Sequence, residues 1–276
     1  MEFLVLSDIH DTWTHLRKML RLASEMDGVI FLGDLMTFRK FTKDSKENLT
    51  RIREASRWMV GLPGNGALPS VRELLNELGI NLHSRGRTID GVGFFGIGGV
   101  QETIGTIIEI REFFRNEDTT GITPDEQALE TLNIFGIHRE NDTFVVSDWS
   151  ESDIAALEVY TSPFEHTEAR ISEMISSAYT QVEKASVQIL LSHTPPYEPG
   201  VVAAFPLGVS TGSKAIAAFL EKNPIAIALS GHNHIHHEFF IDSTKCVIIP
   251  AVTDGFYGIL SVEPSTENIS TKIYNF

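Results

Sequence analysis

Short apolar runs alternate with amphipathic segments over the first third of the chain. The run Phe3 to Ser7 is continuous and of strand length, as in a strand buried on both faces. Between residues 12 and 26 apolar side chains recur every three or four positions, which predicts a helix. The same patterns predict a strand at 29–32, a helix at 44–59, a loop at 61–66, a helix at 71–78 and short strands within 80–97. Asp44 and Glu47 form a capping-box pattern at the start of the second helix.

This alternation stops near residue 101 and returns after residue 165. The intervening segment is charged and only partly helical, so we interpret it as an insertion or lid at about 101–165 within a single domain. Beyond it the patterns predict a helix at 169–184, a strand at 187–191, a helix at 213–220, a strand at 225–229 and successive strands from 235 to 274. Strands that alternate with helices place the chain in the α/β class.

Composition excludes several kinds of protein. The chain has 276 residues, 42% of them hydrophobic, which is enough for a substantial core. Its longest apolar runs fall far short of the roughly 20 residues that a membrane helix needs, and no basic segment precedes an apolar stretch at the start. We therefore expect a cytoplasmic protein without a membrane partner. Cys246 is the single cysteine, which excludes an internal disulfide and a thiolate metal site.

The charge of the chain is strongly acidic and unevenly distributed. The formal net charge is −15, which argues against a nucleic-acid partner because the phosphate backbone would be repelled. Residues 101–170 contain 16 acidic and 4 basic side chains, so this segment carries −12 of the total. We expect it to lie away from an incoming phosphate group, or to cover the site only after cations have reversed the local charge.

Side chains that can bind a metal occur where predicted strands end. The set consists, in chain order, of Asp8, His10, Asp34, Asn65, His193, His232 and His234. Asn65 lies in the Gly-Pro loop, and the others follow a predicted strand. Because the carboxyl ends of strands in an open α/β sheet face one crevice, we expect these side chains to converge.

The chemistry of this set indicates two divalent cations. Imidazole nitrogens together with carboxylate and amide oxygens suit Mn, Fe, Ni or Zn. More than four protein ligands indicates a pair of ions, and one carboxylate such as that of Asp34 can bridge ions about 3.5–4 Å apart. Two ions at that separation can clamp a phosphoryl group.

Each motif also has a purely structural interpretation. Asp8 and His10 can form a cap or turn, Gly64-Asn65 can be turn residues, and His193 can be a hydrogen-bonded histidine at a strand end. The chain has five such motifs, all in predicted loops and four of them directly after a strand. So many coincidences at strand ends favour the metal site over unrelated turns. We assign His15, His138 and His166 to the surface or the core. At most one of His236 and His237 can face the crevice, because neighbouring residues of a strand point to opposite faces.

Taken in order, these motifs resemble those of the calcineurin-like metallophosphoesterase superfamily. The matching blocks are Asp8-Ile9-His10, Gly33-Asp34, Gly64-Asn65, His193 and Gly231-His232-Asn233-His234. The segments LPGN, NLHSRGRTIDGVGFFGIGG and LLSHTPPYEPG are similar to the small prokaryotic phosphodiesterase branch. The resemblance implies a four-layer αββα sandwich of two mixed β-sheets flanked by helices. It also implies a metal-dependent phosphoesterase, and favours a phosphodiesterase over a phosphomonoesterase.

The resemblance also distributes the ligands between the two ions. It places Asp8, His10 and His234 on one ion, Asn65, His193 and His232 on the other, and Asp34 between them. It implies a small phosphate-ester substrate attacked by a metal-activated water, with Mn, Fe, Ni or Zn as the cation and manganese among the expected metals.

One position departs from the family pattern. In much of the superfamily a histidine that assists the leaving group follows the asparagine, whereas here Asn65 is followed by Gly66 and Ala67. Neither can transfer a proton, so the catalytic acid is unknown and a weakly active or non-catalytic scaffold on the same fold is the alternative function. A nuclease is a second alternative, disfavoured because no basic groove is evident. The sequence leaves open the substrate, the metal, the role of the insertion and whether the chain forms a homo-oligomer.

Overall fold

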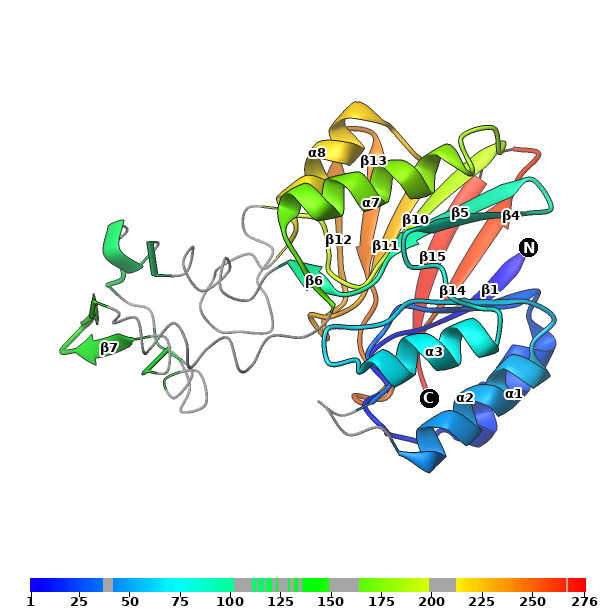
Figure 1. Cartoon of the computed structure of the whole chain (residues 1–276), viewed down its shortest axis with the longest axis horizontal. Helices are drawn as coiled ribbons and strands as arrows, with labels where there is room; N and C mark the ends of the chain where they lie inside the picture. Colours follow the sequence, from blue (N-terminus) through cyan, green and yellow to red (C-terminus); the bar gives the residue numbers. More distant parts are fainter. Residues whose placement is uncertain are drawn as a thin grey trace.

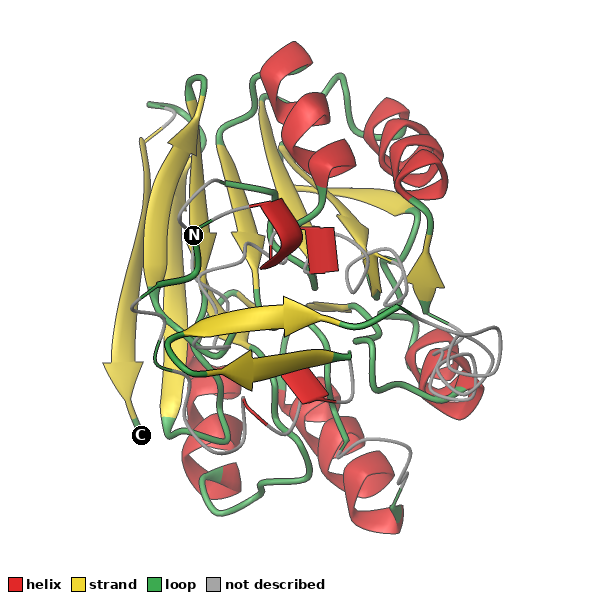
Figure 2. Cartoon of the chain, turned by 90° about the vertical axis from the view of Figure 1, so that its left-hand side faces the viewer, coloured by secondary structure: helices red, strands yellow, loops and turns green. Residues whose placement is uncertain are grey.

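Two mixed β-sheets form the centre of the fold. The computed structural model describes residues 1–36, 42–101, 111–112, 114–116, 118–120, 123, 129, 132–133, 136–148, 164–198, 212–266 and 268–276. In Figure 1 the two large sheets lie between α1, α2 and α3 on one side and α7 and α8 on the other. The view turned by 90° keeps the helices at opposite ends with the strands between them (Figure 2).

The first sheet contains five strands in the order β15-β14-β1-β2-β3. Its parallel strands are β1 (Glu2–Leu6), β2 (Gly28–Phe31) and β3 (Met59–Gly61). Its antiparallel strands are β14 (Phe256–Glu263), which pairs with β1, and β15 (Asn268–Asn275). The three parallel strands therefore end at the same edge of the sheet.

The second sheet contains six strands in the order β12-β13-β11-β10-β5-β4. Its parallel strands are β5 (Val92–Ile97), β10 (Val187–Ser192), β11 (Ile227–Ser230) and β13 (Thr244–Ile248). The antiparallel strands β4 (Arg85–Ile89) and β12 (His237–Ile241) lie at its two edges. Two short pairs complete the described strands, namely β6 (Val100–Gln101) with β9 (Glu165–His166) and β7 (Ile137–Glu140) with β8 (Thr143–Val146).

Helices cover the outer face of each sheet. They are α1 (Leu16–Glu25), α2 (Lys43–Ala55), α3 (Pro69–Glu77), α7 (Glu168–Thr180) and α8 (Lys214–Lys222). Apolar side chains fill three layers: one between the first sheet and α1 to α3, one between the two sheets, and one between the second sheet and α7 and α8. This is the predicted αββα sandwich, and the prediction of the fold is confirmed.

The continuous apolar runs are explained by burial on both faces of each strand. In β1, Leu4 and Leu6 pack in the layer beneath the helices, whereas Phe3 and Val5 pack in the layer between the sheets. Successive side chains of a strand point to opposite faces, so a central strand of a sandwich needs apolar residues at every position. All four side chains are essentially buried.

Four details of the predicted helices are wrong. Two of them are helix ends: α2 ends at Ala55 rather than at residue 59, because Met59 begins β3, and α7 ends at Thr180 rather than at residue 184. The first helix begins at Leu16 rather than at residue 12, because residues 8 to 15 form turns in which the Thr12 N–H binds the Ile9 carbonyl at 2.8 Å. The cap of α2 is Thr42, whose hydroxyl accepts the Ser45 N–H at 3.1 Å, and not the predicted Asp44 with Glu47. Asp44 instead lies in the first turn, where its charge suits the helix dipole.

The predicted acidic insertion lies largely outside the described residues. Within it the structure describes the β7–β8 hairpin, and its predicted role as a lid remains a prediction. Phe164 at its end is buried in the core beneath α1 to α3. No helix in the described ranges combines the length and apolar character needed to cross a membrane.

Candidate metal centre

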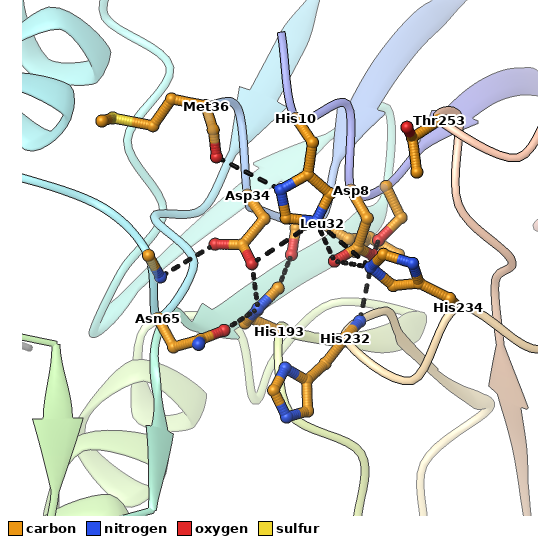
Figure 3. Close-up of polar contacts among 12 residues, drawn as sticks. Asp8, His10, Leu32, Asp34, Met36, Asn65, His193, His232, His234 and Thr253 are labelled. Atoms are coloured by element: carbon orange, nitrogen blue, oxygen red, sulfur yellow. Dashed lines mark hydrogen bonds and ion pairs between the residues drawn. The ribbon is translucent and has the colours of Figure 1, made fainter. Parts of the chain in front are cut away.

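The seven predicted ligands lie in loops at the carboxyl ends of neighbouring strands. Asp8 and His10 follow β1, Asp34 follows β2 and Asn65 follows β3 in the first sheet. His193 follows β10, and His232 and His234 follow β11, in the second sheet. Figure 3 shows these side chains gathered at one place, with the ring of His232 below that of His193. The site therefore lies where the ends of the two sheets meet.

The backbone at the site adopts a conformation that most residues avoid. Five of the seven predicted ligands have positive φ angles, namely Asp8 (52°), His10 (47°), Asp34 (50°), His232 (70°) and His234 (56°). A left-handed residue costs on the order of 1 kcal/mol, and such residues concentrate at functional sites. These left-handed residues lie at the same place where the polar side chains meet.

Three glycines allow the loops to approach one another closely. A Cβ atom on Gly64 would lie 1.8 Å from Asp34 Oδ1, and one on Gly231 would lie 1.9 Å from Ser7 Oγ. Gly33, at φ +113°, would place its Cβ 2.6 Å from His193 Nδ1. Any larger residue in place of these glycines of the Gly-Asp, Gly-Asn and Gly-His blocks would therefore collide with side chains of the site.

Asp8, His10 and His234 form the first group of converging ligand atoms. The Nε2 atoms of His10 and His234 lie 3.1 Å apart. Asp8 Oδ1 lies 3.5 Å from His234 Nε2 and 3.8 Å from His10 Nε2. The second Asp8 oxygen accepts the His232 backbone N–H at 3.0 Å and is bonded to the Ser7 hydroxyl.

Asp34, His193 and again Asp8 form the second group. His193 Nε2 lies 3.5 Å from Asp34 Oδ2 and 2.9 Å from Asn65 Oδ1. Asp34 Oδ2 also lies 3.9 Å from His10 Nε2, so this carboxylate contacts both groups, while its Oδ1 accepts the Gly66 N–H at 3.1 Å. The His232 ring belongs to neither group, although its centroid is 5.1 Å from that of His193.

The buried carboxylates are held in their ionised form. Burial alone raises the pKa of Asp8, but the imidazoles of His234 and His193 and the Ser7 hydroxyl outweigh it and hold the pKa below its usual range. Burial likewise opposes ionisation of Asp34, yet His193 keeps the pKa of this carboxyl low. Two adjacent buried anions demand positive charge nearby.

The imidazoles respond in opposite directions to this negative charge. Burial lowers the pKa of His193, but the carboxylates of Asp34 and Asp8 outweigh it and raise that pKa to about 9. For His232, burial and the neighbouring His193 lower the pKa to about 4. A proton on His193 thus partly neutralises the pair of carboxylates in the metal-free chain.

The donor set fits divalent cations. Among the described residues, no hydrogen-bond donor reaches the buried Asp8 Oδ1 atom. His10 Nδ1 and His193 Nδ1 donate to the carbonyls of Met36 and Leu32 at 3.2 and 2.9 Å, so the lone pair of each neutral ring lies on Nε2 and faces the centre. Ligands bound about 2.1 Å from one ion lie about 3–3.5 Å apart. In the first group the corresponding distances are 3.1, 3.5 and 3.8 Å, so small side-chain shifts would bring these atoms onto one ion.

We predict that the metal-free protein loses stability as the pH rises from about 6.5 to about 9. The folded chain retains a proton on His193 that the unfolded chain releases near pH 6.5, so the resulting stability is complete below that pH and lost by about 9. At about 1.4 kcal/mol per pH unit, the loss is at most about 3.5 kcal/mol.

Thermal melts in chelator across this pH range measure the effect. His193→Gln should remove most of the pH dependence, since no proton is then bound at this position, and His234, whose pKa the Asp8 carboxylate also raises, should account for the rest. A melting midpoint in the parent protein that stays constant from neutral to alkaline pH would contradict the assignment of this proton to His193.

Sequence reasoning missed residues that support the site from outside. Asp254, in the loop before β14, places Oδ2 at 3.6 Å from His234 Nδ1. The Ser7 hydroxyl is bonded to the Asp8 carboxylate. The only sequence signal for this contact was the position of a serine directly before the aspartate. The signal for Asp254 was weaker still, because the Thr-Asp-Gly sequence around it is typical of an ordinary turn.

The other histidines lie elsewhere. His15 is the N-cap residue of α1 and stacks on Phe276, with ring centroids 4.7 Å apart. His166 stacks on His83, and His138 is exposed. His236 lies 3.5 Å from Glu238, and the His237 ring stacks on Phe239.

The comparisons agree with this geometry. The chain belongs to the calcineurin-like phosphoesterase family, whose sequence profile matches residues 1–236. This family depends on a dinuclear metal centre and acts on small phosphate esters, so membership supports phosphoester hydrolysis. No curated protein matches the chain in sequence.

Solved structures with the same fold are distant in sequence. The protein TT1561 of Thermus thermophilus is 17% identical with a TM-score of 0.61, and the match covers 98% of this chain and 97% of that one. A dimetal phosphatase from Danio rerio is 13% identical with a TM-score of 0.53, covering 100% and 96%. The phosphopantetheinyl hydrolase PptH from Mycobacterium tuberculosis is 13% identical with a TM-score of 0.51, covering 91% and 90%. At these identities the matches establish the fold.

Proposed function

We propose that this chain hydrolyses a small phosphodiester at a centre of two divalent cations, drawn from Mn, Fe, Ni and Zn. The observation that carries the proposal is the convergence of the Asp8 and Asp34 carboxylates with the inward-facing Nε2 atoms of His10 and His193. When bound, such a pair would supply Lewis acidity toward the phosphoryl oxygens and an activated water as nucleophile.

The chain's own residues would hold the cations and orient the ester. We assign Asp8, His10 and His234 to one cation, Asn65, His193 and His232 to the other, and Asp34 to both. The contacts of Asp34 Oδ2 with His193 and His10, at 3.5 and 3.9 Å, support its assignment between the two groups. Backbone hydrogen bonds to Asp34 from Gly66 and to Asp8 from His232 fix the carboxylates before any ligand arrives.

The assignment of His232 needs a ring rotation or a small loop adjustment. Its backbone N–H binds Asp8, but its ring lies beside the His193 ring and outside both groups of ligand atoms. The lowered pKa, to about 4, keeps this ring neutral and able to bind a cation at neutral pH.

The preference for a diester rests on the similarity of several segments to the small prokaryotic phosphodiesterase branch. A scaffold without catalysis is the competing function, and Gly66 is the feature that favours it. The ionised pair of buried aspartates favours the enzyme, since a scaffold has no need for two adjacent anions in its interior.

Metal analysis and two chromogenic esters test the proposal. After removal of metal with chelator and reconstitution with Mn²⁺, we expect two ions per chain and faster hydrolysis of bis(4-nitrophenyl) phosphate than of 4-nitrophenyl phosphate. Trace metal only would refute the ligand assignment. Stoichiometric metal without turnover would favour the scaffold, and faster monoester hydrolysis would refute the diester preference.

A further inference from the structure

Three imidazoles at the centre share one arrangement. Each turns Nε2 toward the carboxylates and places Nδ1 near an oxygen atom outside the group. For His10 this oxygen is the Met36 carbonyl at 3.2 Å, and for His193 it is the Leu32 carbonyl at 2.9 Å. For His234 it is Asp254 Oδ2 at 3.6 Å.

The outer oxygen decides which nitrogen of a neutral imidazole carries the proton. A carbonyl only accepts, so the neutral, metal-binding forms of His10 and His193 carry their proton on Nδ1 and present the Nε2 lone pair inward. No backbone carbonyl is recorded at His234 Nδ1 among the described residues, and the carboxylate of Asp254 occupies the equivalent place. Its distance exceeds that of a normal hydrogen bond, but its negative charge attracts the Nδ1–H group at this range.

The loop that carries Asp254 is attached to the loop that carries Asp8. The backbone N–H groups of Val252 and Thr253 donate to the carbonyls of Ser7 and Asp8 at 2.8 and 3.2 Å. The hydroxyls of Thr12 and Thr253 are bonded at 3.0 Å. On the other side, the Phe276 N–H donates to the Gly255 carbonyl at 2.9 Å. The position of the Asp254 backbone is thus fixed relative to the site.

We propose that Asp254 is a positioning residue that holds the His234 ring with Nε2 toward Asp8 and strengthens it as a ligand. The inference rests on the proposed function, in which His234 binds one of the two cations. A carboxylate behind an imidazole orients the ring and increases its basicity, and loss of such a partner typically weakens metal binding about 10–100-fold. Unlike the two carbonyls, this partner is a side chain and can be removed by substitution.

A set of variants separates this role from that of an ordinary surface charge. Asp254→Ala removes both the acceptor and the charge, Asp254→Asn keeps an acceptor without the charge, and Asp254→Glu restores both. Glu221→Gln on α8 is the matched control, since it also neutralises one exposed carboxylate. Titration with Mn²⁺, followed by the electron paramagnetic resonance of the free ion, measures the two affinities without any reliance on turnover.

We expect Asp254→Ala to lower the affinity for one of the two Mn²⁺ ions about 10–100-fold and to leave the affinity for the other near the parent value. Asp254→Asn should lose less, Asp254→Glu should recover part of the loss, and Glu221→Gln should match the parent. In the Zn²⁺-loaded protein, the proton resonance of His234 Nδ1–H should shift upfield in Asp254→Asn, a change that general destabilisation would not produce.

The outcomes distinguish a failure of the role proposed for Asp254 from a failure of the proposed function. Two tightly bound ions in Asp254→Ala, with affinities equal to those of the parent protein, would overturn the role of Asp254 and leave the proposed function standing. An equal loss of affinity for both ions in Asp254→Ala, with the same loss in Glu221→Gln, would also overturn the role of Asp254. A parent protein that binds no metal would overturn both.

Discussion

Asp34→Asn is expected to remove most of the bound metal and to lower kcat/KM for a phosphodiester by at least about 10³-fold, since metal ions typically supply several kcal/mol of transition-state stabilisation. Asp34 Oδ2 lies near His193 on one side and near His10 on the other, at 3.5 and 3.9 Å. A neutral amide contributes one oxygen and no charge, so it cannot serve two cations as a carboxylate does.

The substitution is conservative for the fold. Asparagine tolerates the left-handed backbone of residue 34, at φ 50°, and keeps an oxygen that can accept the Gly66 N–H. Loss of metal would therefore reflect the lost charge rather than a collapsed loop.

Asp90→Asn is the matched control. Asp90 is exposed in the turn between β4 and β5 and has nearly the same backbone angle, φ 48°. Elemental analysis after reconstitution, with initial rates on the same samples, gives the comparison. If Asp34→Asn retained two ions per chain and parent rates, Asp34 would not bridge, and Asp8, which belongs to both groups of ligand atoms, would be the remaining candidate.

Much of the fold is predictable from the sequence because the central strands, such as β1, β2, β5 and β11, are buried on both sides. The runs FLVL and VIFL contain no polar position, so their strand character does not depend on knowing their partners. The ligand loops are predictable for the same reason, since a polar residue directly after such a run must lie at the edge of the sheet.

Details set by tertiary contacts are not predictable in this way. The pattern of apolar residues from position 12 continues that of α1, yet the chain uses residues 8 to 15 for turns that place Asp8 and His10. Thr42 rather than Asp44 caps α2, because its hydroxyl also binds Asp11 at 3.2 Å, far away in sequence. Asp254 carries no local signal, since its role depends on a hydrogen-bonded loop beside Asp8.

The leaving group should depart with little protonation, because no side chain at position 66 replaces the usual histidine. Gly66 is buried and its backbone N–H is bonded to Asp34 Oδ1 at 3.1 Å. The rate should therefore fall steeply as the leaving group becomes more basic. General acid catalysis is typically worth about 10²–10⁴-fold, which is the deficit we expect for alkyl relative to aryl esters.

A series of methyl aryl phosphates with phenols of graded pKa measures this dependence as the slope of log kcat/KM. Gly66→His should flatten the slope and recover part of the rate on the most basic leaving groups, because the φ angle of Gly66 is not among the positive ones and a side chain is compatible with it. Gly66→Gln is the matched control, since it adds a side chain of similar length that cannot transfer a proton. Metal content must be equal in all three proteins.

A shallow slope in the parent protein would show that another group protonates the leaving oxygen. His236 and His237 are the nearest histidines in sequence to the His232 and His234 loop, but His236 is paired with Glu238 at 3.5 Å and His237 stacks on Phe239. His236→Gln and His237→Gln would then identify the donor, since only loss of the true acid should steepen the slope. If neither variant did so, a water molecule would be the remaining acid, and Gly66 would mark a change in the source of the proton rather than a loss of catalysis.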